Sequence, residues 1–173
     1  MTSEAATGAG PGIRFRNGRL EIEPHNCFAC GSLNTHGLRL ELHAQDGHCW
    51  TALELPRRFE GWEGIAHGGI VATILDEVMA WALVEHDLWG VTARMSIEFR
   101  QPVPLETPVR ADGWITDARR RVVEAASAIV DARDGALLAR GTATFVGASP
   151  ARKAELQARY RMRIVPDAEA DGA

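Results

Sequence analysis

The stretch that decides the fold is IAHGGIVATILDEVMAWALVE, residues 65–85. A His-Gly-Gly triplet occupies residues 67–69, and the run after it is apolar on nearly every side of a helix. Asp76 and Glu77 are the only acidic residues within residues 70–84. A helix that is apolar all round is normally buried, and a carboxylate is rarely fully buried unless something pairs with it or uses it. We therefore predict a buried central helix, from about residue 68 to 86, with a candidate general base in its middle.

Strand patterns flank this helix in the sequence. Residues 38–43 alternate leucines with polar residues, which predicts a strand with one buried face, and the turn pair Asp46-Gly47 joins it to an antiparallel partner at residues 48–55. After the helix, five apolar positions alternate with polar ones over residues 91–100, a period typical of a strand. Three further strands are expected near residues 109–115, 122–130 and 137–146.

Two strands, one apolar helix and four strands indicate an α+β fold. A curled antiparallel sheet of about six strands around one long central helix covers that helix with few elements. Because one sheet does not cover every side of such a helix, a second copy of the chain is the natural cover for the rest.

The chain of 173 residues fits one domain with tails. We expect a disordered tail at residues 1–12, the folded domain at 13–148, and a polar, partly helical extension at 149–173. The net charge of −4 argues against nucleic acid as the main partner. No run has the length and apolarity of a membrane span, and the first residues do not resemble a secretory signal. With three cysteines, too few for a disulfide framework, we expect a cytoplasmic protein.

The start of the helix is a candidate site for negative charge. The first amides of a helix have no partners within the helix and favour an anion, and glycines at 68 and 69 let a ligand approach that backbone closely. A carbonyl that becomes a tetrahedral oxyanion is one such ligand. The alternative is that Gly68 and Gly69 only ease a tight turn into the helix.

Asp76 lies nine residues after His67, which is roughly 13 Å along the helix axis. Because catalysis needs contact near 3 Å, Asp76 does not reach a carbonyl held at the start of its own helix. Either Asp76 is a structural carboxylate, or two antiparallel helices from two subunits bring one helix start beside the middle of the other. Glu77 is turned about 100° round the helix from Asp76, so the two carboxylates do not both face one site, and spacing alone does not choose between them.

The combination HGGIVATILDE followed by TARMSIEFRQPVP resembles the hotdog-fold acyl-CoA thioesterases, in particular the PaaI-like group. The resemblance covers roughly residues 26–146 and implies a hotdog fold, at least a homodimer or a dimer of dimers, and hydrolysis of an acyl-CoA to a free acid and CoA. No cofactor is implied beyond the CoA of the substrate.

The resemblance also implies roles for individual residues. Asp76 would act as general base on water or as nucleophile, the Gly68 amide would polarise the thioester carbonyl, and His67 would help to position it. Thr92 matches a position where the group often has a hydroxyl that holds the water. One departure is Gly61, because several relatives carry Asn or Gln there.

Further residues are candidates for contacts with the substrate. The cluster Arg119, Arg120 and Arg121 suits the phosphates of CoA, and the alternative is a solvated turn. Trp62, in the loop before the helix, is a candidate wall of the acyl pocket. Gly69 and Glu77 complete the set of expected substrate-binding residues, although Glu77 would otherwise pair with an arginine or reach solvent.

The segment His25–Gly31 invites a zinc interpretation, with His25, Cys27, Cys30 and His36 as four ligands. The close spacing of His25 and Cys27 and the absence of a second Cys-x-x-Cys disfavour it. A similar CFxCG segment occurs in some PaaI-like relatives, so we interpret it as a turn before the first strand and expect no metal.

Two other functions fit the resemblance. One is a hotdog enoyl-CoA hydratase or dehydratase, whose different arrangement of histidine and acid is not found here. The other is a non-catalytic acyl-CoA binding protein, which the glycine at position 61 makes worth testing.

Overall fold

The computed structural model describes residues 13–15 and 18–166. Nine strands form one sheet in the order β11-β2-β1-β3-β4-β8-β9-β10-β7. Its strands are β1 (Ile13–Phe15), β2 (Gly18–Glu21), β3 (His43–Gln45), β4 (His48–Glu54), β7 (Gly90–Phe99), β8 (Pro108–Arg119), β9 (Val122–Asp131), β10 (Leu137–Gly147) and β11 (Arg163–Pro166). The remaining elements are the 3-10 turn η1 (Arg57–Phe59), the strand pair β5 (Glu60–Trp62) and β6 (Ile65–Ala66), and the helices α1 (Gly68–Glu85) and α2 (Pro150–Arg159).

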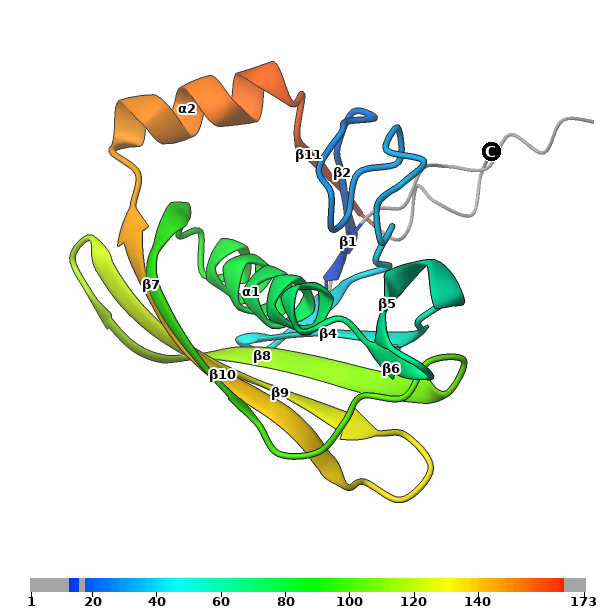
Figure 1. Cartoon of the computed structure of the whole chain (residues 1–173). Helices are drawn as coiled ribbons and strands as arrows, with labels where there is room; N and C mark the ends of the chain where they lie inside the picture. Colours follow the sequence, from blue (N-terminus) through cyan, green and yellow to red (C-terminus); the bar gives the residue numbers. More distant parts are fainter. Residues whose placement is uncertain (1–12, 16–17, 167–173) are drawn as a thin grey trace, which may run out of the picture.

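Helix α1 lies in the hollow of the curled sheet, as Figure 1 shows. Its apolar residues Ile74, Leu75, Val78 and Ala82 are fully buried. A Cβ atom at Gly113 of β8 would lie 2.5 Å from the Val78 carbonyl carbon, so only glycine lets the helix backbone rest directly on this strand. The fold expected from the sequence is thus confirmed: β3, β4, β8, β9, β10 and β7 are its six antiparallel strands.

The predicted strand at residues 38–43 is wrong for most of its length. Leu40 and Leu42 are buried as the alternation predicts, but β3 begins only at His43. The amides of Leu38 and Leu40 donate instead to the carbonyl oxygens of Phe28 and Ala29, at 2.8 and 2.9 Å. The segment therefore lies against the Cys27–Cys30 turn rather than in the sheet.

Strand β7 forms one edge of the sheet, because β10 is its only neighbour among the described strands. Its alternation predicts a buried face, yet Val91 is 72% exposed and Phe99 is 56% exposed. A register shift beside Thr92 places Thr92, rather than Val91, on the face of β7 that looks toward α1. The predicted apolar face is therefore observed over Met95, Ile97 and Phe99, whereas Val91 faces the opposite side of the sheet.

The expected tail at residues 1–12 lies outside the described residues. Within them, no helix is both long enough and apolar enough to cross a membrane.

Candidate active site

The start of α1 is capped by the side chain of His67. Its Nδ1 accepts a 3.0 Å hydrogen bond from the Gly69 amide, and its carbonyl accepts from the amides of Ile70 and Val71. Because an accepting ring nitrogen carries no proton, the neutral ring has its proton on Nε2. The Gly69 amide, a predicted substrate contact, is thus already used by the cap.

The Gly68 amide is different. Among the residues that the structure describes, it has no hydrogen-bond acceptor, and Gly68 is exposed. A Cβ atom here would lie 3.5 Å from the Phe99 ring, an ordinary contact, so the packing within one chain does not require glycine. The free donor and the bare backbone leave this position open to a ligand.

A cavity of about 370 Å³ opens at this helix start. Gly68 and Trp62 line it together with Phe99 and the segment from Arg100 to Val103. Trp62 is 82% exposed and contributes to the lining of this cavity. The structure thus brings Trp62 and Gly68 together at one hollow.

Asp76 lies half-buried in the middle of α1. Thr92 Oγ1 on β7 donates a 2.7 Å hydrogen bond to Asp76 Oδ1. The register of β7 against β10 shifts beside Thr92, and such bulges are a common way to aim a side chain. The structure therefore brings together Asp76 and Thr92, two residues that the sequence analysis selected separately.

Glu77 points to the other side of α1 from the Asp76 site. Its Oε1 accepts a 2.8 Å hydrogen bond from Trp81 Nε1, and Cys30 hydrogen-bonds to the same carboxylate. Burial, with a smaller contribution from the nearby Cys27, raises the pKa of Glu77 to about 7. The contact between Glu77 and the cysteines was missed in the sequence, because they lie far apart along the chain.

The close packing around Gly61 accounts for the absence of the Asn or Gln that the family resemblance suggests at this position. A Cβ atom at Gly61 would lie 2.9 Å from the Cα atom of His67, and the His67 amide donates to the Phe59 carbonyl at 2.9 Å. The chain before α1 thus packs directly on His67, which leaves no room for an Asn or Gln side chain in this arrangement.

The three arginines occupy the hairpin between β8 and β9, where Arg120 has a positive φ of 53°. Arg119 pairs with Asp117 at 2.8 Å, and Arg121 Nε donates to the Gly147 carbonyl at 2.9 Å. Since Gly147 pairs with Gly90, the hairpin lies at the end of the sheet where β7 begins. Gly68 lies beside Phe99, at the other end of β7.

In one chain, the candidate residues therefore fall into separate groups. Gly68, His67 and Trp62 lie at the helix start. Asp76, with Thr92 of β7 beside it, lies eight residues further along α1, which is roughly 12 Å of helix. The arginines lie beyond them, toward the helix end.

Comparison with known proteins identifies relatives of this architecture. The model of the thioesterase superfamily matches residues 63–139. A crystal structure of a thioesterase superfamily protein superposes with a TM-score of 0.67 at 27% identity, covering 70% of this chain and 60% of that one. The chain thus spans less than two thirds of that protein. No curated protein sequence matches the chain significantly.

Two further solved structures share the fold. A Streptococcus mutans protein bound to acetyl CoA has a TM-score of 0.60 and 19% identity, covering 64% of this chain and 89% of that one. The E. coli PaaI protein, from an operon of phenylacetic acid degradation, has a TM-score of 0.57 and 15% identity, with 60% and 75% covered. These likenesses agree with the curled sheet and central helix described above.

Proposed function

We propose that the chain hydrolyses an acyl-CoA to a free acid and CoA, because it has the hotdog fold and the thioesterase superfamily model matches residues 63–139. The active site is shared between two copies of the chain. Hydrolysis requires no cofactor beyond the CoA that forms part of the substrate.

One observation carries this proposal. The unpaired Gly68 amide and the Asp76 carboxylate held by Thr92 are the donor and the base that thioester hydrolysis needs. They lie on one straight helix, roughly 12 Å apart, so they do not act on one carbonyl within one chain. Two antiparallel α1 helices in a dimer would place the Gly68 amide of one chain beside the Asp76 of the other.

In this mechanism the thioester carbonyl accepts a hydrogen bond from Gly68 N–H, while the neutral His67 ring helps to position it. Asp76 takes a proton from a water molecule that Thr92 helps to hold, and the water oxygen adds to the carbonyl carbon. The oxyanion then re-forms the carbonyl group and the C–S bond breaks. The CoA thiolate leaves and takes up the proton that Asp76 had accepted. In the alternative, the Asp76 carboxylate itself adds to the carbonyl, and water hydrolyses the resulting anhydride.

The uncovered edge of the sheet supports a dimer. The apolar side chains Val91 and Phe99 of β7 are exposed in the single chain, and an unpaired strand edge is a ready surface for a second strand. A two-fold axis beside β7 would pair this strand edge with the same edge of a second copy. A dimer of dimers is the other assembly that the family resemblance suggests.

The substrate proposal has two supports. The S. mutans structure holds acetyl CoA on the same fold. Of the three hairpin arginines, Arg120 has no partner among the described residues, so its guanidinium is available to a phosphate. The acyl group then enters the hollow lined by Trp62 and Gly68.

The experiment is to incubate the purified protein with acyl-CoAs of varied length, including aromatic ones, and to detect the released thiol. We expect wild type to hydrolyse part of the panel and Asp76→Asn to lose at least a hundredfold in kcat. Asp87→Asn is the matched control, since Asp87 is exposed with a φ of 58°, a conformation that Asn accepts readily.

Three results would contradict the proposal. Full activity of Asp76→Asn would remove the assigned base. Tight binding of acyl-CoA without release of thiol by wild type would indicate a binding protein. Conversion of an enoyl-CoA to a 3-hydroxyacyl-CoA would indicate a hydratase.

A further inference from the structure

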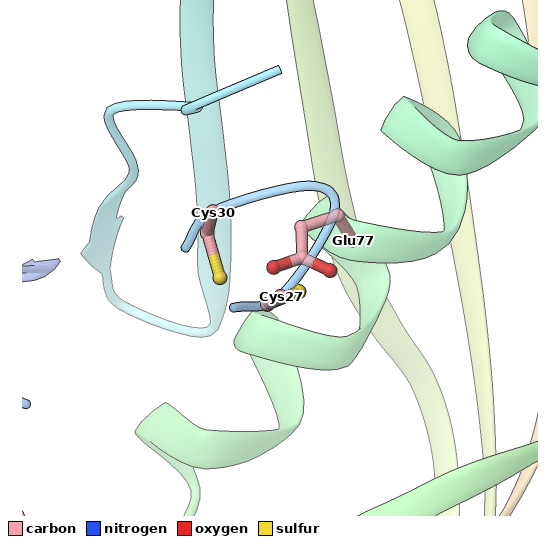
Figure 2. Close-up of side chains that lie close together, drawn as sticks. All are labelled: Cys27, Cys30 and Glu77. Carbon is pink, nitrogen blue, oxygen red and sulfur yellow. The ribbon is translucent and has the colours of Figure 1, made fainter. Parts of the chain in front are cut away.

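The side chains of Cys27, Cys30 and Glu77 converge at a single point between the N-terminal segment and α1. Their two sulfur atoms and a carboxylate oxygen all lie within 4.8 Å of one another. Figure 2 shows both thiols turned toward the carboxylate, which α1 presents to them. Of the His, Cys, Asp and Glu side chains that the structure describes, this is the one group of three arranged closely enough to hold an ion.

The backbone of the turn holds the two thiols on the same side. The amides of Ala29 and Cys30 hydrogen-bond to the Cys27 sulfur, and the Gly31 amide donates to the Cys27 carbonyl at 2.9 Å. A Cβ atom at Gly31 would lie 2.4 Å from the Cys27 nitrogen, so only glycine closes this turn. Amides directed at a sulfur stabilise its thiolate form, which is the form that binds metal.

The surroundings fix this turn in place. The carbonyl groups of Phe28 and Ala29, between the two cysteines, accept hydrogen bonds from Leu38 and Leu40. The apolar residues Ala29, Leu40 and Leu42 are buried in the core. The turn is therefore anchored by its own backbone and by the chain that follows it.

The third group is also oriented. Trp81 Nε1, one turn along α1, donates to Glu77 Oε1 at 2.8 Å. A hydrogen bond to one carboxylate oxygen is the outer contact that commonly orients a metal ligand. The Cys30 thiol also hydrogen-bonds to this carboxylate, and an ion that displaces the thiol proton would contact both groups.

We propose that Cys27, Cys30 and Glu77 bind a zinc ion, with the fourth coordination position open to the adjoining cavity. Thiolate and carboxylate ligands in a tetrahedral site are typical of zinc. Zn–S bonds of about 2.3 Å place two sulfur ligands roughly 3.8 Å apart. Because a carboxylate oxygen and a sulfur on the same ion lie roughly 3.6 Å apart, the three groups need to close by at most about 1.2 Å from their present limit of 4.8 Å.

The cavity supplies the fourth position. It measures about 680 Å³, and all three proposed ligands line it. A site with three protein ligands and one open position binds water or a ligand group. The ion would also tie the N-terminal segment to α1 one residue from Asp76, so that metal binding stabilises the fold.

This assignment differs from the zinc site considered from the sequence. His25 lies outside the group, because its Nδ1 accepts the Cys27 amide at 3.3 Å. His36 lies outside it as well. Glu77, almost fifty residues later in the sequence, takes the place that the histidines were considered for.

Oxidation of the two thiols to a disulfide would compete with metal binding. The hydrogen bond from Cys30 lowers the pKa of Cys27 to about 5, a property that redox-active cysteine pairs share. The experiment therefore begins with fully reduced, metal-free protein, with its thiols counted before metal is added.

The test is titration of this reduced full-length protein with Co²⁺, followed by displacement with Zn²⁺. We expect one equivalent of Co²⁺ to give thiolate-to-cobalt charge-transfer absorption and the ligand-field bands of a tetrahedral site. Cys27→Ser and Cys30→Ser should abolish the charge-transfer signal of the pair, and Glu77→Gln should weaken Co²⁺ binding by more than about tenfold.

Cys49→Ala is the matched control, because it removes the third cysteine, which is buried in β4, and should leave the spectrum unchanged. Zinc should raise the Tm of wild type and of Cys49→Ala but not of Cys27→Ser. Reduced, folded wild type that shows no charge-transfer band would overturn the proposal. The same holds if Cys49→Ala loses the band, or if the pair isolates as a disulfide and shows no binding after reduction. None of these readouts depends on hydrolysis of a thioester.

Discussion

Thr92 Oγ1 donates a 2.7 Å hydrogen bond to Asp76 Oδ1 and so joins the exposed edge strand β7 to the middle of the buried helix α1. The bond occupies one carboxylate oxygen and fixes the direction of the other. Thr92 therefore acts on Asp76 as well as on any water that both side chains hold.

We predict that Thr92→Ala lowers kcat roughly tenfold to a hundredfold, because a hydrogen bond to a charged group contributes about 1.5–3 kcal/mol. KM should change little, since Thr92 orients the base rather than the CoA. Thr92→Ser keeps the hydroxyl and should restore most of the rate. Steady-state kinetics on the best acyl-CoA measures both, and equal losses in the Ala and Ser variants would contradict this role.

The sequence predicted the elements that local patterns control. The helix expected over residues 68–86 is observed as Gly68–Glu85, and the turn at Asp46-Gly47 has the two positive φ angles, 53° and 80°, typical of that pair. Periodicity and turn chemistry depend on residues that are close together in the sequence, so a single sequence is sufficient to recognise them.

What the sequence did not predict depends on contacts between distant segments. The alternation of Leu38, Leu40 and Leu42 gave the right buried face, but hydrogen bonds to the cysteine turn replaced the strand ladder. The short strands β1, β2 and β11, which extend the sheet beyond β3, were not predicted. The meeting of Glu77 with Cys27 likewise follows from the fold and not from spacing.

Gly61 gives a prediction about stability. We expect Gly61→Ala to destabilise the fold by about 1–3 kcal/mol, as forced overpacking does, because its Cβ atom would lie 2.9 Å from His67 Cα. Gly68→Ala is the control, since its Cβ atom meets Phe99 at an ordinary 3.5 Å. Urea denaturation compares the two, and equal stability of both variants would show that the chain before α1 shifts freely.

The environment of Asp131 leads to a prediction about how the stability of the fold depends on pH. Hydrogen bonds from Arg133 lower the pKa of Asp131 to about 2, below the roughly 3.9 of an unfolded aspartate. The resulting stability is present above about pH 4 and is lost as the pH falls toward 2. Asp131→Asn should therefore be less stable than wild type at neutral pH, and the difference should shrink on acidification. Denaturation midpoints across this range measure it, and a constant difference would contradict the assigned cause.

The exposed edge strand β7 leads to a prediction about dimer formation. Val91→Arg places a charge on the exposed edge strand β7 and should yield monomers in sedimentation velocity, with loss of hydrolysis, because the proposed site needs two chains. Leu33→Arg, at another exposed apolar residue, should leave the assembly unchanged. Active monomers of Val91→Arg would contradict the shared site, and intact dimers would place the interface elsewhere.

The shared site itself is testable with two inactive variants. Gly68→Pro removes the proposed oxyanion donor, yet proline is well accepted at the first position of a helix, and His67 before it is already extended, with a ψ of 134°. We expect Gly68→Pro to lose about a hundredfold to a thousandfold in kcat without loss of helix content by circular dichroism.

Mixing Gly68→Pro with Asp76→Asn, after unfolding and refolding together, should recover activity. In a mixed dimer, one site combines the intact Asp76 of the first variant with the intact Gly68 amide of the second, while the other site carries both defects. Random pairing then restores roughly a quarter of the wild-type rate. A site contained within one chain would keep one defect in every copy, so absence of recovery in refolded mixtures that do form dimers would refute the shared arrangement. Refolding each variant alone is the control and should yield no gain.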